Sequence, residues 1–250
     1  MTVEDCARLV ERGDPDRFRV GMAAPPAARE ALFPLYAFNL EVARAPWVTR
    51  EPLLAEMRLQ WWRDALAEAA AGEPPRAHEV AEPLARLIQG RGLDVAPLDA
   101  LAEARRRDIE ARPFEAEEVR AYVRGTAGNL MRATCAALGE NRPEAEEAGF
   151  AGGLAAWLLA LPDLAARGRG LADTSAASVT ALAEEGLAAL AAARRHRFRA
   201  AVPALRASFL ARPVLRHARR EPQAALDGGL APSEGARRAR LLWLTLRGAW

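Results

Sequence analysis

Apolar side chains recur every three to four residues along almost the whole chain, which is the spacing of one face of an α-helix. No run alternates apolar and polar positions over the length of a strand. Ala, Leu, Arg and Glu dominate, and β-branched residues are scarce, which favours helix further. Proline and glycine clusters divide the chain into about ten helical segments. The pattern therefore predicts an all-α protein.

Capping residues and helix breakers set the expected boundaries. We expect a first helix, capped by Thr2 with Asp5, to end at Gly13. The helix expected over 26–44 should be kinked at Pro34. Thr49 should cap the helix over 50–71, and Pro162 should end the helix over 144–161. After the first, the expected helices cover 26–44, 50–71, 78–89, 97–112, 115–138, 144–161, 178–199, 203–219 and 233–250, with a glycine-containing loop over 167–175.

Linkers long enough to separate domains are not apparent, so we expect residues 1–250 to form one orthogonal helical bundle. A separate small unit after about residue 200 is the less favoured alternative. The apolar share of 51% excludes a disordered chain. The 35 basic residues are all arginine and are balanced by 33 acids, so no nucleic-acid partner is expected.

The two cysteines, Cys6 and Cys135, are too few for a disulfide framework and indicate a reducing compartment. The first residues do not have the basic and then apolar pattern of a signal peptide. The sequence has no run of 18 apolar residues, so no membrane span is expected. A cytoplasmic location is therefore expected.

Simple catalytic and metal-binding patterns are not found. His78, His196 and His217 do not pair with each other or with a cysteine at metal-ligand spacing, so no metal is expected. A glycine-rich phosphate loop and a nucleophile elbow are also not seen. Cys135 lies on an apolar helix face, which predicts an inert buried thiol.

Several motifs, in a fixed order, resemble those of the squalene/phytoene synthase family. The stretch 18–38 has the family's Phe18, Pro26, Arg29 and Tyr36-Ala37-Phe38. Similar matches follow at Trp62-Arg63, at Asp108, at Tyr122 with Thr126-Ala127-Gly128, and at Gly168-Arg169. The resemblance implies the all-α fold of trans-isoprenyl diphosphate synthases, the terpenoid synthase type. It also implies head-to-head joining of two prenyl diphosphates, assisted by Mg²⁺ bound to aspartates.

The residues that should bind this Mg²⁺ differ from the family pattern. Ala43, Arg44 and Trp47 occupy the three aspartate positions of the first acidic motif, and Leu40 replaces its arginine. The second acidic stretch, 159–169, keeps only Asp163. Arginine, alanine and tryptophan cannot ligate Mg²⁺. The resemblance therefore implies a degenerate, non-catalytic protein that needs no cofactor.

Two strings resemble a non-catalytic subgroup of the family that includes a mitochondrial assembly factor of respiratory complex I. They are Ala37-Phe38-Asn39-Leu40-Glu41 and Met57-Arg58-Leu59-Gln60-Trp61-Trp62, and the leucine-rich 241–250 is similar too. This resemblance implies a protein partner, such as an assembly intermediate of a respiratory complex. It is also compatible with peripheral contact with the inner membrane, although no single helix is identified as an anchor.

Two alternatives stay open at this point. The chain could be an active Mg²⁺-dependent prenyltransferase that uses Glu41, Asp108, Glu110 and Asp163, or a module that binds a prenyl diphosphate or lipid through Arg44. We expect Trp47 and Trp62 to fill the cavity of a non-enzyme. The candidate cavity and ligand-binding residues are Tyr36, Phe38, Asn39, Glu41, Ala43, Arg44, Trp47, Asp108, Tyr122, Gly128, Trp157 and Asp163.

Overall fold

The computed structural model describes residues 2–49 and 51–250. Within these residues the regular structure is helical, which confirms the predicted all-α class. The α-helices are α1 Val3–Gly13, α2 Pro15–Met22, α3 Pro26–Arg44, α4 Pro52–Ala70, α5 Ala81–Arg91, α6 Ala96–Ala104, α7 Ala116–Val123, α8 Asn129–Ala137, α9 Ala145–Ala166, α10 Ala176–Ala193, α11 Val202–Leu205, α12 Ala211–Arg220, α13 Gln223–Leu226 and α14 Glu234–Leu246. Three short turns have a pitch that differs from that of an α-helix: the 3₁₀ turns η1 Arg105–Ile109 and η3 Arg206–Ser208, and the π turn η2 Arg124–Gly128.

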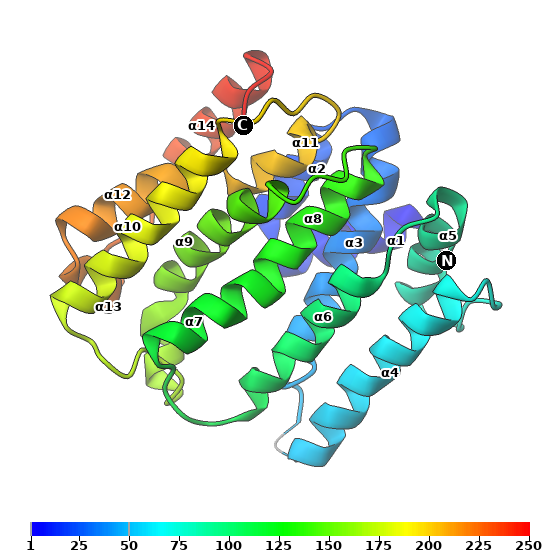
Figure 1. The fold of residues 1–250 in the computed structure, drawn as a ribbon, viewed down its shortest axis with the longest axis horizontal. Helices are drawn as coiled ribbons and strands as arrows, with labels where there is room; N and C mark the ends of the chain where they lie inside the picture. The colour runs from blue at the N-terminus through cyan, green and yellow to red at the C-terminus, as the bar shows by residue number, and fades with distance from the viewer. Residues whose placement is uncertain (1, 50) are drawn as a thin grey trace.

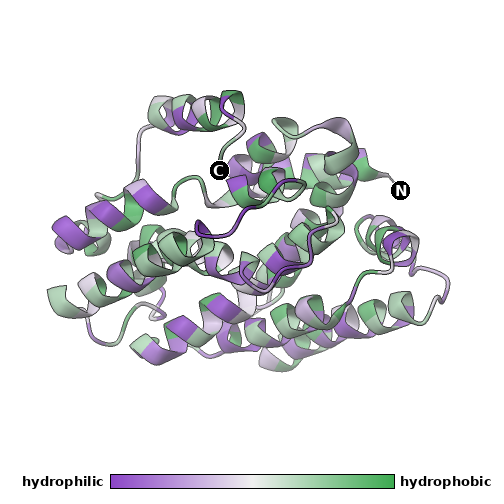
Figure 2. Cartoon of the chain, turned by 45° about the horizontal axis from the view of Figure 1, so that its top comes forward, coloured by the Kyte–Doolittle hydropathy of each residue, from purple (hydrophilic) through white to green (hydrophobic). Residues whose placement is uncertain are grey.

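Helix α9 is the central helix of one half of the molecule. It lies beside α10 and also packs against α8, η2 and α12 (Figure 1). Its own residues are apolar on almost every face, and about half of them are buried against these neighbours. The other half is built on α3, which packs against α1, α2, α5 and α8. Most other helices carry both apolar and hydrophilic positions along their length (Figure 2). Most of them turn an apolar face towards one of these two cores, whereas α14 packs on a third, small cluster.

The local signals predict several helix ends well. Thr2 and Asp5 form the expected reciprocal cap, and α1 ends at Gly13. Helix α3 begins and ends as predicted and continues through Pro34; the kink at that residue stays a prediction. The predicted cap at Thr49 is replaced by Glu51, because Pro52 begins α4. The predicted start of that helix at residue 50 lies outside the described residues.

The prediction that Pro162 ends a helix is wrong, because α9 continues to Ala166. A proline inside a helix loses one hydrogen bond and costs about 3 kcal/mol. Here Leu158 and Leu161 are fully buried in the same cluster as Val179 of α10, and this packing keeps the helix intact.

Other boundaries differ because turns of altered pitch interrupt the expected helices. The helix predicted at 97–112 becomes α6 followed by the 3₁₀ turn η1, and 115–138 contains the π turn η2. Helix α10 ends at Ala193, and the 3₁₀ turn η3 separates α11 from α12. Helix α2 was not predicted; Asp14 caps it, accepting a hydrogen bond from the Arg17 amide at 2.9 Å.

Helices α9 and α10 are long and apolar enough to cross a bilayer by length and composition alone. Both pack against each other and against α12, and core helices of helical bundles commonly meet the same criterion. The sequence-based expectation of no membrane span stays a prediction.

Candidate functional site

Four polar side chains from three elements meet between the two halves of the molecule. Asn39 comes from α3, Arg105 and Asp108 from η1, and Tyr122 from α7. The Tyr122 hydroxyl donates to Asp108 Oδ2 at 2.7 Å, and Arg105 Nη1 donates to the Tyr122 oxygen. Arg105 also reaches Asp108 Oδ2 and Asn39 Oδ1, each at 3.4 Å. We call these four residues the interior polar cluster.

The local backbone explains how the cluster forms. In a 3₁₀ turn, side chains three positions apart lie on the same side, so η1 points Arg105 and Asp108 in the same direction. Tyr122 lies one turn before the π turn η2, where the Thr126 hydroxyl donates to the Tyr122 carbonyl at 2.7 Å. The backbones of η2 and α9 touch at Gly149, where an added Cβ would lie 2.5 Å from the Ala127 carbonyl oxygen. Close packing of η2 on α9 thus fixes the position of the phenol.

The charges of the cluster compensate each other. Asp108 is only 4% exposed, and burial raises the pKa of its carboxyl group, while the positive charge of Arg105 lowers it. Burial also raises the pKa of the Tyr122 phenol, which therefore stays a hydrogen-bond donor. Asp108 Oδ2 accepts from both Tyr122 and Arg105. The buried carboxylate is therefore engaged within the protein.

Trp47 lines a cavity close to the cluster. Helix α3 ends at Arg44, and the following turn carries the indole against two arginines of the 167–175 loop. The Arg167 and Arg169 guanidinium carbons lie 5.1 and 4.4 Å from the centre of the Trp47 ring, within cation–π range. A cavity of about 260 Å³ beside them is lined by Trp47, Ile109 and Arg169, among others.

Aromatic side chains fill the far side of the cluster. The Phe114 ring lies edge-on to Tyr122 and to Trp157, with centroid distances of 5.3 and 6.0 Å. The backbone of Phe114 also bonds to Gly170 and Ala172, at 2.8 Å in both cases, which fastens the arginine-bearing loop to the cluster.

A second, smaller cavity lies between α3, η2 and α9. Its volume is about 130 Å³, and its lining includes Tyr36, Ala127, Met131 and Gly153. Within the described part of the chain, the buried Tyr36 hydroxyl has no hydrogen-bond partner. Pockets that hold drug-sized ligands usually measure about 300–1,000 Å³. This cavity is therefore too small for a molecule with two or more isoprene units.

The other predicted site residues lie outside the interior polar cluster, in several parts of the molecule. Glu41 and Arg44, near the end of α3, pair at 3.5 Å and line an outer groove instead of the interior. Asp163 is exposed on α9, and Ala43 is half-buried on α3. Gly128 is buried where η2 meets α9, and an added Cβ would lie 2.9 Å from the Glu146 side chain.

Two of the aromatic residues predicted to line the site pack in the hydrophobic core instead. Phe38 and Trp62 pack edge-to-face in the core between α3 and α4, with centroids 5.5 Å apart. Trp62 therefore does not occupy either cavity. Arg105 and Phe114 were missed by the sequence analysis. Arg105 belongs to an arginine run that looks solvent-exposed, and only its three-residue spacing from Asp108 could have indicated the pair.

The donor set does not fit Mg²⁺. Among residues 2–49 and 51–250, no three His, Cys, Asp or Glu side chains gather where they could hold a metal ion. Mg²⁺ requires oxygen ligands in near-octahedral geometry. Two guanidiniums face the Trp47 ring, and Glu51 is the one acid among the described residues that line the cavity beside it. Asp108 is engaged with Arg105 and Tyr122.

An open groove of about 610 Å³ lies on the outside, between the end of α3 and helix α4. Trp61, Trp62 and His78 contact one another along it, with ring centroids 4.9 to 5.3 Å apart. At its rim Leu54 and Met57 are 42% and 60% exposed. We call this feature the α4 groove.

Residues 10–243 match the family described as squalene/phytoene synthase. The chain belongs to the squalene/phytoene synthase family. Human NADH dehydrogenase (ubiquinone) complex I, assembly factor 6 is 25% identical over 162 residues, which are 63% of this chain and 48% of the human protein. The Drosophila melanogaster homolog is 30% identical over 132 residues, 50% of this chain and 39% of its own length. The matches thus span about half or less of these relatives.

Solved structures share the fold. A dehydrosqualene synthase in complex with ligand superposes with a TM-score of 0.81 at 15% identity, over 98% of this chain and 95% of the other. Squalene synthase HpnC from Alicyclobacillus acidocaldarius gives 0.61 at 20% identity, over 98% and 94%. The predicted terpenoid synthase fold and the resemblance to both the family and the assembly factor are confirmed.

Proposed function

We propose that this chain is a non-catalytic member of the family, with degenerate aspartate-rich motifs, that acts through protein contacts. Its role is in the assembly of a respiratory NADH dehydrogenase complex, in the cytoplasm beside the inner membrane. Its relatives named as complex I assembly factors support this proposal. No cofactor is required for such a role.

The observation that carries the proposal is the position of Trp47. By its place in the first acidic motif, Trp47 stands where the resemblance puts a metal-binding aspartate of catalytic members, and Arg167 and Arg169 flank its ring. A diphosphate leaving group needs its negative charge neutralised as the carbon–oxygen bond breaks. Tryptophan has no oxygen ligand, and arginine cannot bind Mg²⁺. The reaction would lose several kcal/mol of transition-state stabilisation.

An activity assay tests the non-catalytic half of the proposal. The purified chain would be given farnesyl and geranylgeranyl diphosphate with Mg²⁺, and pyrophosphate release and organic-phase product would be followed. We expect no turnover, with an active dehydrosqualene synthase as the positive control. Turnover that EDTA abolishes would overturn the proposal and support the prenyltransferase alternative, in which Glu41, Asp108, Glu110 or Asp163 rebuild a metal site.

The α4 groove is the proposed contact surface. Its rim exposes Leu54 and Met57, and its wall contains Trp61 and Trp62 from the string that resembles the assembly-factor subgroup. Exposed apolar groups that border a groove are typical of protein-binding sites. We therefore place the partner's apolar side chains on this rim.

A complementation experiment tests this surface. A strain lacking the gene should have less assembled NADH dehydrogenase, measured by native gel and membrane NADH oxidation, and the wild-type gene should restore it. The double variant Leu54→Glu/Met57→Glu should fail to restore it. Met22→Glu is the matched control, because Met22 is 44% exposed on α2. Full restoration by the groove variant would contradict this contact surface.

A prenyl diphosphate- or lipid-binding module is the second candidate. The buried Tyr36 hydroxyl without a partner in the 130 Å³ cavity would suit a small polar group, but that cavity is too small for a prenyl chain. Arg44, which would hold the phosphate, instead lines the α4 groove. Titration calorimetry with farnesyl diphosphate and no Mg²⁺ should give no heat at high micromolar ligand. Heat that Arg44→Ala removes would favour the binding module.

A further inference from the structure

The charges of the chain are strongly segregated along the sequence. Residues 194–250 hold 13 of the 35 arginines but only three of the 33 acids, a formal charge of +10. Residues 1–193 carry −8. The overall charge of +2 therefore conceals a strongly basic segment. Such a segment attracts polyanions, and the attraction weakens as salt increases.

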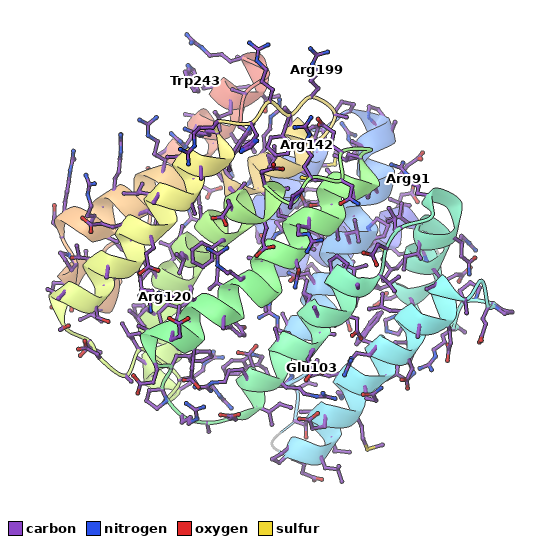
Figure 3. The ribbon with its side chains drawn as sticks, in the orientation of Figure 1. Arg91, Glu103, Arg120, Arg142, Arg199 and Trp243 are labelled. Carbon is purple, nitrogen blue, oxygen red and sulfur yellow. The ribbon has the colours of Figure 1, made fainter. Side chains whose placement is uncertain are left out.

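Helix α14 belongs to this segment and lies at one edge of the molecule (Figure 1). Leu241 and Leu244 attach it to the body, in a small cluster with Val20 and Phe209. The opposite face carries Leu242, Trp243 and Leu246, which are 60%, 51% and 78% exposed. Trp243 points away from the bundle at the upper edge of Figure 3. A helix that needs only one face for packing thus presents apolar side chains on another.

Arginines lie along the flank of this helix. Residues 240, 243 and 247 share one face, because three, four and seven positions correspond to about one or two helical turns. The Arg247 guanidinium lies 4.7 Å from the Trp243 ring centre. Arg240 donates to the Phe209 carbonyl, and Arg194 Nη2 donates to the Trp250 carbonyl at 2.9 Å.

Arg194, Arg212 and Arg240 form a like-charged group. Burial lowers the pKa of Arg240, and the nearby positive charges of Arg194 and Arg212 lower it further. Within the described residues, none of the three pairs with an Asp or Glu side chain. Among the described residues before 194 most arginines pair with acids; Arg120, for example, binds Glu185 at 2.6 Å. Like charges held together without a counter-charge are stabilised by an external anion.

We propose that α14, together with Arg194, Arg212 and Arg240, is a docking surface for a bilayer that contains anionic phospholipids. Leu242, Trp243 and Leu246 enter the interface between headgroups and acyl chains, where tryptophan is favoured. The guanidiniums bind the lipid phosphates. Apolar residues at the centre of the face distinguish a bilayer from a nucleic acid, whose backbone offers them no apolar environment. The assembly function is not a premise of this proposal.

Vesicle sedimentation tests the proposal with the full chain. Vesicles of phosphatidylcholine alone would be compared with vesicles that contain phosphatidylglycerol, at low and high salt. We expect binding to the phosphatidylglycerol vesicles that is at least tenfold tighter than to phosphatidylcholine and is reduced by high salt. Protein that stays in the supernatant with both vesicles would overturn the proposal.

Paired variants identify the surface. Arg194→Gln/Arg212→Gln and Leu242→Ser/Leu246→Ser should each weaken vesicle binding by at least tenfold. The controls are Arg12→Gln/Arg58→Gln, two exposed arginines elsewhere, and Leu53→Ser, which is 70% exposed on α4. The controls should bind like the wild type. If test and control variants bind equally, the proposed surface is wrong. Circular dichroism and thermal unfolding would identify any misfolded variant.

Two readouts separate a bilayer from other anions. Brominated lipids should quench Trp243 fluorescence, and Trp243→Phe should lose that part of the quenching. DNA added as competitor should not release the protein from phosphatidylglycerol vesicles. Release by DNA at equal phosphate concentration, without a contribution of Trp243 to quenching, would instead identify the surface as a nucleic-acid site.

Discussion

The interior polar cluster has paired charges and covered aromatic rings, whereas the outer surfaces of α4 and α14 expose large apolar side chains. In the interior, Asp108 is bound by Arg105 and Tyr122, and aromatic rings fill the surrounding space. On the outside, Leu54, Met57, Leu242 and other large apolar side chains are exposed. In an enzyme of this fold we would expect unsatisfied carboxylates inside and a less apolar exterior. This difference agrees with the proposed role, in which the interior stabilises the protein and the surface makes its contacts.

Removal of the buried carboxylate should have the largest effect on stability. Asp108→Ala leaves the Arg105 charge buried without a counter-charge, and losing one partner of a buried pair costs about 3–5 kcal/mol. Urea unfolding would measure the change in the free energy of unfolding. The surface variant Leu54→Glu/Met57→Glu should change it by less than about 0.5 kcal/mol. Equal losses for the two variants would remove the contrast between interior and surface.

Gly149→Ala should have the next largest effect. The new Cβ would lie 2.5 Å from the Ala127 carbonyl oxygen and 2.6 Å from the Met131 Cβ, so α9 must move away from η2. Overpacking of this kind costs about 1–3 kcal/mol. Thermal unfolding would measure it, with Gly90→Ala as the control, because nothing lies within 4 Å of a Cβ at Gly90. An unchanged midpoint for Gly149→Ala would mean that close packing of η2 on α9 is not required.

Trp47→Ala tests whether the closed site hides an active one. The half-buried ring loses its contacts with Arg167 and Arg169, which should cost about 1–2 kcal/mol of stability. Opening the space should not produce turnover of farnesyl diphosphate, because Arg167 and Arg169 remain and cannot bind Mg²⁺. Pyrophosphate release by Trp47→Ala, but not by the wild type, would show that the indole only blocks a working site.

Helical periodicity explains how much of this site could be predicted. Tyr36, Asn39 and Ala43 recur at three and four positions along α3, and Asn39 reaches the interior polar cluster. Arg44 lies about 100° further round the helix than Ala43 and opens to the α4 groove. Motif matching placed Arg44 with the aspartate positions, but only the three-dimensional packing decides which side of the helix end faces inward.

Other features depend on contacts that sequence reasoning cannot supply. Arg105 stands in a run of three arginines, which locally looks like a solvated helix face. Its burial depends on α3 and α7, which contribute Asn39 and Tyr122 from 66 and 17 positions away in the sequence. The continuation of α9 through Pro162 likewise depends on packing against α10, which outweighs the local signal.

The smallest expected effect is that of an exposed ion pair beside the interior. Glu118 on α7 accepts from Arg112 at 2.6 Å and from the Glu115 amide at 2.9 Å, and these bonds lower the pKa of its carboxyl group to about 2. A lowered pKa in the folded state means that the contribution to stability is present above the ordinary value of 4.5 and is lost as the pH falls towards about 2. Because both side chains are partly exposed, we expect the pair to contribute less than about 1 kcal/mol to the free energy of unfolding.

Urea unfolding of Glu118→Gln at pH 7 and pH 3 measures this contribution. The difference from the wild type should shrink at pH 3, and at pH 7 it should be much smaller than the loss caused by Asp108→Ala. A loss from Glu118→Gln as large as that from Asp108→Ala would mean that surface pairs stabilise this fold as much as its buried pair.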